Sequence, residues 1–338
     1  MKVCVYFEPR RKNDNFEGTR LRKNIKGALE LENIPYSKNF LDTYDLVHFI
    51  SIKDEIKIAD LKENGVPVVF SALSCENDEM ARIMEIKNGV NTISPKALRV
   101  LNKVDRIFVG DETSKNILLR AGVEKPISIV TPGVNLARFE LTKASEDEIF
   151  FQYYQLERDT NIVVSVGSYE DREIVKKFVE IAKRCPKYKF FYFGPELGAY
   201  KAYRISKKLP DNVKLSAITN DEIYRSMMKH AKIYLMLDNS KHSPITLLDA
   251  AASKTQVIAL KPLGYNEEIL KEIRAYACDD VDDIAKTINE LLENKLQSNV
   301  KEALKFARSN SLSNLGKSLR KEYEAVLMEV KGKWLIKN

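Results

Sequence analysis

The chain has 338 residues, of which 44% are hydrophobic, and a net charge of +7 from 55 Lys and Arg against 48 Asp and Glu. This composition is typical of a globular protein with substantial cores, and the length allows two domains of ordinary size. No run approaches the roughly 20 apolar residues that cross a bilayer. The apolar run within residues 1–7 is too short for a secretory signal, and a charged residue comes too close to its start.

The first half of the chain alternates short apolar runs with segments of helical periodicity. A parallel sheet with helices on both faces is the structure that this alternation predicts. The expected strands are 3–7, 45–50, 66–70, 106–110 and 127–131, and the expected helices are 19–32, one that opens at Pro95, and 113–121. A turn at residues 132–135 follows the last of these strands.

The pattern then restarts and predicts a second α/β domain with its own sheet. Its expected strands are 160–166, 189–193, 213–217, 233–237 and 256–260, the last completing the sheet, and its expected helices are 174–184, 202–208, 221–229 and 245–253. Residues 281–308 also look helical. A final amphipathic helix over 311–330 is expected to cross back onto the first domain, where it can bury its apolar stripe.

We therefore expect two Rossmann-like domains that face a central cleft. The first covers 1–145 together with the crossing helix 311–338, and the second covers 146–310. Ligands bind such sheets at the carboxyl ends of the strands.

Cysteine and histidine usage limits the chemistry. The four cysteines (Cys4, Cys75, Cys185 and Cys278) form no close pair, and the chain has three histidines. This pattern argues against zinc and against a disulfide framework, and it favours reduced thiols in the cytoplasm.

Basic residues gather in two places. Seven lie in residues 10–26, and Lys96, Arg99, Lys103 and Arg106 mark a second group. Such groups attract anionic membranes, nucleic acid or nucleotide phosphates, although a solvated basic face is an equally good interpretation. Since no nucleic-acid-binding signature accompanies them, we expect no nucleic-acid partner.

Several fragments, in order, resemble the family-4 retaining glycosyltransferases of the GT-B fold. The likeness is greatest to the bacterial diacylglycerol glucosyl- and galactosyltransferases that make membrane glycolipids. The fragments are the 1–3 strand, the 18–20 turn, 44–48, 131–139, 165–167, 178–183, 193–194, 247–253 and 313–317. The resemblance implies transfer of a hexose, with retention, from a nucleotide-sugar that we expect to be UDP-linked. It also implies no metal and no cofactor besides the donor.

The chain departs from the family pattern at three places. Residues 71–74 lack the histidine that contacts the donor sugar in relatives. The phosphate turn has Ser168 and Glu173 where relatives have an arginine and a lysine, so Arg172 is its nearest cation. The family's paired acids correspond to Lys241 and Asp249. A cation missing from such a site removes stabilisation of the departing diphosphate.

The resemblance assigns two sets of candidate residues. The donor set comprises Gly167, Ser168, Arg172, Gly194, Lys241, His242, Thr246 and Asp249, and the acceptor or membrane set comprises Gly18, Thr19, Arg20, Arg22, Lys23, Lys26, Ser71 and Ser74. Gly167 also fits a plain turn glycine, and whether Asp249 faces a ligand is open.

Two hypotheses follow. In the first, an active glycosyltransferase at the inner membrane face takes a nucleotide-sugar and adds its hexose to a lipid or surface-polysaccharide precursor. In the second, a catalytically inactive GT-B protein acts as a binding module or as a partner subunit of an active glycosyltransferase. A third class, the nicotinamide-dependent dehydrogenases, lacks support because no glycine-x-glycine-x-x-glycine turn follows the first strand.

Overall fold

The computed structural model contains two compact units. It describes residues 1–6, 16–50, 55–73, 84–85, 91–140, 148–167, 169, 171–194, 209–217, 220–237, 244–263 and 267–337. The first unit comprises Met1–Gly133, His242–Ile245 and Asn310–Asn338, and the second comprises Val134–Lys241 and Thr246–Ser309. The division after Gly133 lies earlier in the chain than the expected boundary at 145.

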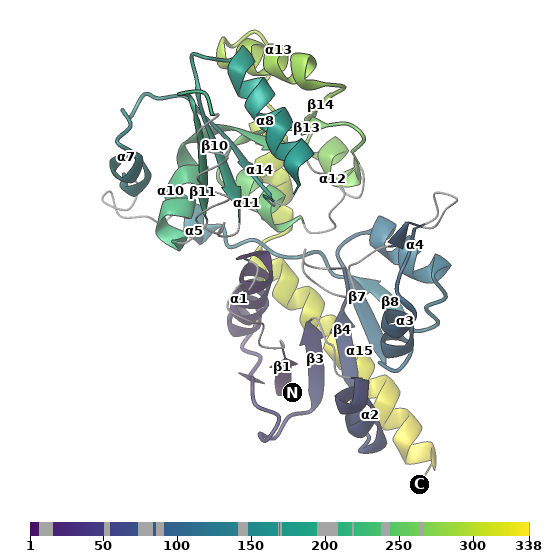
Figure 1. The fold of residues 1–338 in the computed structure, drawn as a ribbon. Coiled ribbons are helices and arrows are strands. Elements are labelled where there is room, and N and C mark those ends of the chain that lie inside the picture. Colours follow the sequence, from purple (N-terminus) through teal and green to yellow (C-terminus); the bar gives the residue numbers. More distant parts are fainter. Residues whose placement is uncertain are drawn as a thin grey trace. The chain divides into compact units, whose positions relative to one another are not determined.

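The first unit is built on a six-stranded sheet in the order β2-β1-β3-β4-β7-β8, with every neighbouring pair parallel (Figure 1). Its strands are β1 (Val3–Tyr6), β2 (Tyr36–Ser37), β3 (Leu46–Ile50), β4 (Val68–Ser71), β7 (Arg106–Val109) and β8 (Ile127–Ile129). A separate antiparallel pair joins β5 (Met84–Glu85) and β6 (Asn91–Thr92). The sequence missed β2, which is too short to show a period.

Alternate residues of these strands enter two different cores. Leu46 and Ile50 of β3 belong to the core that includes α1 and α15, whereas Val47 and Phe49 belong to the opposite core. This burial on both faces explains the continuous apolar runs of the sequence. The helices of this unit are α1 (Phe16–Leu31), α2 (Glu55–Glu63), α3 (Pro95–Leu101), α4 (Glu112–Arg120) and α15 (Leu312–Lys337).

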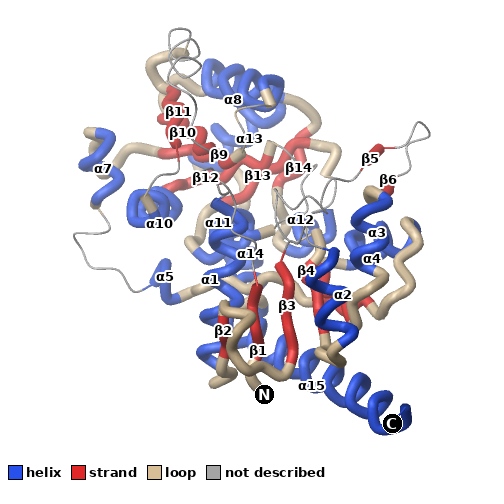
Figure 2. Tube along the Cα trace, turned by 60° about the horizontal axis from the view of Figure 1, so that its bottom comes forward, coloured by secondary structure: helices blue, strands red, loops and turns tan. Residues whose placement is uncertain are grey.

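The chain returns to the first unit through α15, which confirms the expected crossing helix. This helix runs along one face of the sheet beside α1 (Figures 1 and 2). Its buried stripe consists of Leu312, Leu315, Leu319, Tyr323 and Val326. A Cβ on Gly316 would lie 2.5 Å from the carbonyl oxygen of Ala28, so glycine allows α15 to approach α1 closely.

The second unit holds another parallel six-stranded sheet, in the order β11-β10-β9-β12-β13-β14. The strands are β9 (Ile162–Val166), β10 (Lys189–Gly194), β11 (Val213–Ala217), β12 (Ala231–Met236), β13 (Gln256–Leu260) and β14 (Tyr276–Cys278). The expectation that 256–260 completes the sheet is wrong, because β14 pairs with β13 at its edge. At three residues, β14 is too short for a periodic signal.

The helices of the second unit are α5 (Ala137–Glu140), α7 (Ile149–Tyr154), α8 (Arg172–Arg184), α10 (Asp221–His230), α11 (Ile245–Ala252), α12 (Glu267–Glu272), α13 (Val281–Leu292) and α14 (Val300–Ser309). The helical region 281–308 is thus two helices, and the helix expected at 202–208 lies outside the described residues. Side-chain caps fix several helix starts: Asp171 begins α8, Asn220 begins α10 and Asp280 begins α13.

Candidate functional site

The glycine turn after β9 is shaped by tyrosine side chains. A Cβ on Gly167 would collide with the hydroxyl of Tyr192, and one on Gly194 would lie 2.6 Å from the ring of Tyr169. The Tyr169 hydroxyl lies within hydrogen-bond distance of the carbonyl oxygens of Tyr192 (3.0 Å) and Ser216. Burial raises the pKa of Tyr169, so this hydroxyl stays protonated. The two glycines therefore make room for a buried aromatic pair at the ends of β9 and β10.

The start of α8, which follows this turn, is acidic. Asp171 caps the helix by accepting a hydrogen bond from the backbone NH of Ile174 at 3.2 Å, and Glu173 lies in the first turn. Carboxylates there satisfy the positive end of the helix dipole. Arg172 is exposed. The helix start therefore offers an incoming anion one arginine and two competing carboxylates.

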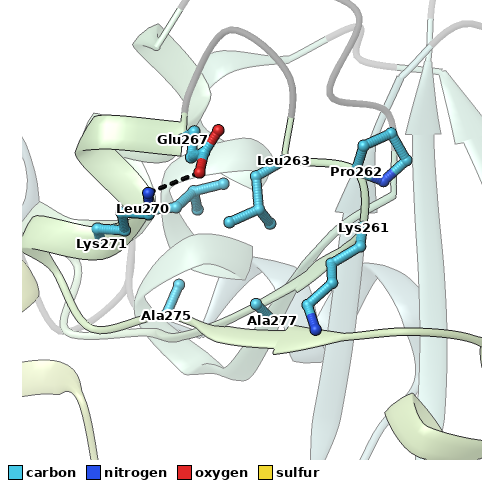
Figure 3. Close-up of a pocket in the computed structure, with 8 residues that line it drawn as sticks. All are labelled: Lys261, Pro262, Leu263, Glu267, Leu270, Lys271, Ala275 and Ala277. Atoms are coloured by element: carbon cyan, nitrogen blue, oxygen red, sulfur yellow. Dashed lines mark ion pairs between the residues drawn. The ribbon is translucent and has the colours of Figure 1, made fainter.

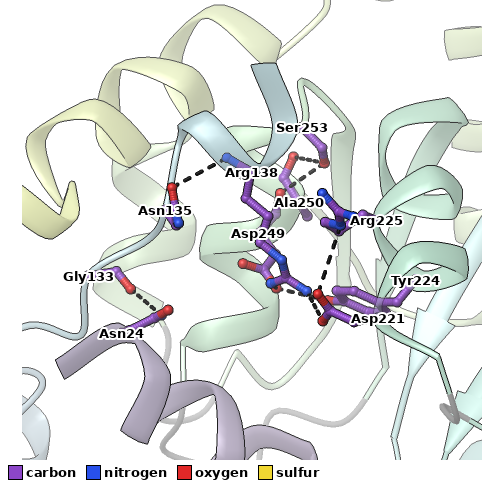
Figure 4. A network of polar contacts seen from close by, with 10 residues as sticks. All are labelled: Asn24, Gly133, Asn135, Arg138, Asp221, Tyr224, Arg225, Asp249, Ala250 and Ser253. Atoms are coloured by element: carbon purple, nitrogen blue, oxygen red, sulfur yellow. Dashed lines mark hydrogen bonds and ion pairs between the residues drawn. The ribbon is translucent and has the colours of Figure 1, made fainter. Parts of the chain in front are cut away.

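A second polar group centres on Asp249 of α11, whose side chain is only 3% exposed (Figure 4). Its Oδ2 accepts a hydrogen bond from the Tyr224 hydroxyl at 3.1 Å and lies 3.7 Å from Nη1 of Arg138. Arg138 also pairs with Asp221, which in turn lies 3.8 Å from Nε of Arg225. The elements α5, α10 and α11 thus supply one connected network.

This network is balanced in charge. Arg138 and Arg225 offset Asp221 and Asp249, and the guanidinium of Arg138 also lies over the ring of Tyr224, 5.7 Å from its centroid. Carboxylate oxygens held in this way can accept hydrogen bonds from ligand hydroxyl groups. The network carries no excess positive charge for a diphosphate.

Sequence reasoning identified only Asp249 of these residues. Arg138 lies inside the 131–139 fragment of the family resemblance, which assigns its charge no role. Tyr224, Asp221 and Arg225 lie on one helix, α10, and their sequence spacing gives no sign that they meet Asp249. Only the packing of α10 against α5 and α11 creates the network.

The other predicted donor residues are placed as follows. Gly167 and Gly194 lie together, because a Cβ on Gly194 would be 2.6 Å from the carbonyl oxygen of Gly167. Thr246 is buried in the first turn of α11, one turn before Asp249. Ser168, Lys241 and His242 lie outside the described residues.

In the first unit, the turn expected at 18–20 is wrong, because these residues lie inside α1. Gly18 is the only glycine or proline between Phe16 and the buried stripe of Leu21, Ile25, Ala28 and Leu29, and α1 continues through it. Arg20 is 2% exposed, and its burial removes it from the expected lipid-facing set.

The remaining basic residues of α1 are crowded. Lys23 is exposed, and Arg22 and Lys26 are half-buried. The pKa of Lys26 is lowered to about 8, first by burial and then by the nearby positive charges of Lys38 and Arg22, with Glu30 opposing. Concentrated positive charge of this kind favours an anionic partner.

Ser71 ends β4, and its hydroxyl lies 2.7 Å from Nε2 of the buried His48. Ser74, the other predicted residue of this segment, lies outside the described residues. Among the described residues, no group of His, Cys, Asp and Glu side chains has the arrangement of a metal site, and no helix is long and apolar enough to cross a membrane.

A further cavity of about 690 Å³ lies in the second unit between the β13–β14 edge and α12 (Figure 3). It is lined by Lys261, Pro262, Leu263, Glu267, Leu270, Lys271, Ala275 and Ala277. Both lysines already have acidic partners, Asp279 at 2.9 Å and Glu267 at 2.6 Å. The cavity therefore has an apolar wall and no excess charge.

Comparison with known proteins identifies related chains. Residues 146–308 match the profile of the family described as glycosyl transferases group 1. Over 332 residues the chain is 23% identical to the processive diacylglycerol alpha-glucosyltransferase of Acholeplasma laidlawii, covering 97% of this chain and 99% of the relative. It is 27% identical over 116 residues to the alpha-galactosylglucosyldiacylglycerol synthase of Streptococcus pneumoniae, covering 32% and 31% of the two chains.

Solved structures show the same architecture. Anabaena HepE, crystallised with UDP-glucose, superposes with a TM-score of 0.70 at 12% identity, covering 96% of this chain and 100% of that chain. A glycosyltransferase from Rickettsia africae gives a TM-score of 0.70 at 14% identity, covering 96% and 98%. Together with the two parallel six-stranded sheets, these likenesses show the fold.

Proposed function

We propose that the protein transfers a hexose, with retention, from a UDP-sugar to a lipid acceptor, because residues 146–308 match the profile of the group 1 glycosyltransferases and the chain has a GT-B fold. The observation that carries the proposal is the alignment with a diacylglycerol glucosyltransferase over 97% of the chain. Diacylglycerol or a glycosylated diacylglycerol is the acceptor that the two relatives' names suggest.

The donor would lie against the second unit. Asp249 is fixed by Tyr224 and Arg138, so its oxygens are preorganised to accept hydrogen bonds from ribose or sugar hydroxyls. Because the described network is balanced in charge, stabilisation of the diphosphate would depend on Arg172, Lys241 and His242. Preorganised positive groups at a departing diphosphate lower the barrier to transfer without a protein nucleophile.

The acceptor would reach the protein at a membrane surface. Arg22, Lys23 and Lys26 lie on α1, and Lys38 adds charge beside Lys26. Each basic residue near an anionic surface contributes about 1 kcal/mol, so a cluster of this size supports reversible docking.

The proposal is tested with the intact protein, UDP-glucose or UDP-galactose, and anionic vesicles that contain diacylglycerol. We expect UDP release that requires the diacylglycerol, and a glycolipid product whose anomeric configuration matches that of the donor. Asp249→Asn should weaken donor binding in calorimetry, whereas Asp282→Asn, on the exposed surface of α13, should not. Binding without diacylglycerol-dependent UDP release would contradict the proposal.

A second candidate, an inactive partner subunit of an active glycosyltransferase, is favoured by one specific observation. The start of α8 carries Asp171 and Glu173, where a diphosphate would meet like charge. In that case calorimetry would detect no binding of UDP or of UDP-sugars. The two candidates are therefore separated by the same titration.

A further inference from the structure

A buried chain of hydrogen bonds crosses the first unit from α15 to the end of β4. The Tyr323 hydroxyl lies 2.7 Å from Nδ1 of His48, and the Ser71 hydroxyl lies 2.7 Å from Nε2 of the same ring. Tyr323 and His48 are fully buried, and Ser71 is 7% exposed. Within the part of the chain that the structure describes, neither hydroxyl has another hydrogen-bond partner.

The imidazole of His48 is uncharged. Burial lowers the pKa of His48 to about 3, and its ring packs edge-on against the apolar Phe108 at 5.4 Å. A neutral imidazole carries one proton, so one nitrogen donates and the other accepts. Two arrangements of the chain are therefore conceivable, and they differ in which hydroxyl keeps a spare proton.

The surroundings of the two hydroxyls decide between these arrangements. If Nδ1 held the proton and donated it to Tyr323, the phenolic proton would be buried at 0% exposure without an acceptor in the described structure. An unsatisfied buried donor is costly. If Tyr323 instead donates to Nδ1, then Nε2 donates to Ser71, and the remaining hydroxyl proton belongs to Ser71, which is 7% exposed, rather than to the fully buried Tyr323.

We propose that the Ser71 hydroxyl donates a hydrogen bond to an uncharged oxygen of the lipid acceptor, either a hydroxyl or an ester carbonyl. His48 and Tyr323 are positioning residues. Ser71 is the last residue of β4, and ligands of parallel sheets bind at the carboxyl ends of the strands. With His48 donating to it, the serine oxygen is oriented as a hydrogen-bond donor. This inference rests on the proposed function for the identity of the ligand.

The direction of the chain is tested first by nitrogen-15 NMR of the histidine rings at pH 7. The sequence contains three histidines, and His48→Gln assigns the signal of interest. We expect a neutral His48 ring protonated on Nε2 and bare on Nδ1. A ring protonated on Nδ1, or on both nitrogens, would overturn the inference whether or not the protein transfers sugar.

The ligand contact is tested by kinetics of Ser71→Ala with dioctanoylglycerol as acceptor. Loss of one neutral hydrogen bond should raise the KM for the acceptor about 3- to 10-fold and leave the KM for the donor unchanged. Tyr323→Phe removes one hydrogen-bond partner of the imidazole, so it should also raise the KM for the acceptor, but by a smaller factor. Ser128→Ala is the matched control, because Ser128 bonds Glu322 of α15 at 2.7 Å without touching His48.

The proposed contact would be contradicted if Ser71→Ala changed only the KM for the donor, or if Ser128→Ala raised the KM for the acceptor equally. If the wild-type protein transfers no sugar, the proposed function fails, and calorimetric binding of dioctanoylglycerol micelles replaces kinetics. Equal affinity of wild type and Ser71→Ala would then overturn the inference, and a 3- to 10-fold weaker affinity of the variant would support it.

Discussion

The two units stabilise polar groups near their sheets in different ways. In the first, Tyr323, His48 and Ser71 form an uncharged, buried chain that needs no counterion. In the second, Arg138, Asp221, Arg225 and Asp249 form an ionic network in which Asp221 is 43% exposed. A neutral chain fixes the direction of one proton, whereas the ionic network includes Asp221, a partly exposed carboxylate whose ion pairs salt can screen. The comparison predicts that the first region responds to pH and the second to salt.

The largest expected effect is the pH response of the first region. The folded-state pKa of His48 is about 3, below the ordinary value of about 6.5, so its stabilising contribution is complete above pH 6.5. As the pH falls from 6.5 towards 3, unfolding takes up a proton and stability drops by about 1.4 kcal/mol per pH unit. Urea unfolding between pH 7.5 and 4.5 measures this slope.

The control for this experiment is His48→Gln, which keeps a donor and an acceptor but does not titrate. Its stability should fall less steeply than that of the wild type over the same range. Parallel slopes for the two proteins would contradict the buried neutral imidazole.

The next effect tests the tyrosine packing of the second unit. In Gly194→Ala, the new methyl group would lie 2.6 Å from both the carbonyl oxygen of Gly167 and the ring of Tyr169. Such overpacking should lower the free energy of unfolding by about 1–3 kcal/mol. Gly332→Ala is the matched control, because a Cβ there meets nothing within 4 Å. Equal stability of both variants in urea would show that the turn is less tightly packed.

Vesicle binding should follow the charge of Lys26. Its pKa of about 8 means that this side chain loses most of its charge between pH 7 and pH 9. Binding to anionic vesicles should weaken over this range by up to about 1 kcal/mol, the contribution of one basic residue. Flotation with vesicles measures the change, and Lys26→Arg should remove it. A pH dependence that survives in Lys26→Arg would assign the charge change to another group.

The smallest effect concerns the ionic network. Asp221→Asn removes the partly exposed carboxylate that pairs with Arg138 and Arg225 and leaves the buried Asp249 beside Arg138, so we expect a loss of about 0.2–1 kcal/mol at low salt. The difference from wild type should shrink in 0.5 M NaCl, while the loss in Tyr323→Phe should not. Arg184→Gln, which breaks the exposed pair with Asp282, provides the baseline. A salt-independent loss would mean that Asp221 stabilises the protein mainly through contacts other than these ion pairs.

The sequence predicted much of the fold because both sheets bury their strands on two faces. Runs such as Leu46–Ile50 and Gln256–Leu260 show as continuous apolar segments. The missed elements include β2 and β14, which are too short to show a period, the six-residue helix α12 and the nine-residue helix α2. The start of α1 was placed late because Gly18 looked like a turn residue, although the helix continues through it.

The site was less predictable than the fold. Asp249 could be chosen from its motif, but its partners Arg138 and Tyr224 come from segments more than 20 residues away. In the sequence, His48 is only one residue of the apolar run 45–50, and its two hydroxyl partners come from β4 and α15. Contacts between distant segments leave no spacing signal in a single sequence.

We propose that this chain is a working glycosyltransferase of a glycolipid-forming type, despite the acidic start of α8. UDP release from UDP-glucose and UDP-galactose by the intact protein on anionic vesicles, measured with and without diacylglycerol, tests this directly. We expect release that depends on diacylglycerol and yields a glycolipid. Absence of release with both donors, together with no heat of binding for UDP, would contradict it.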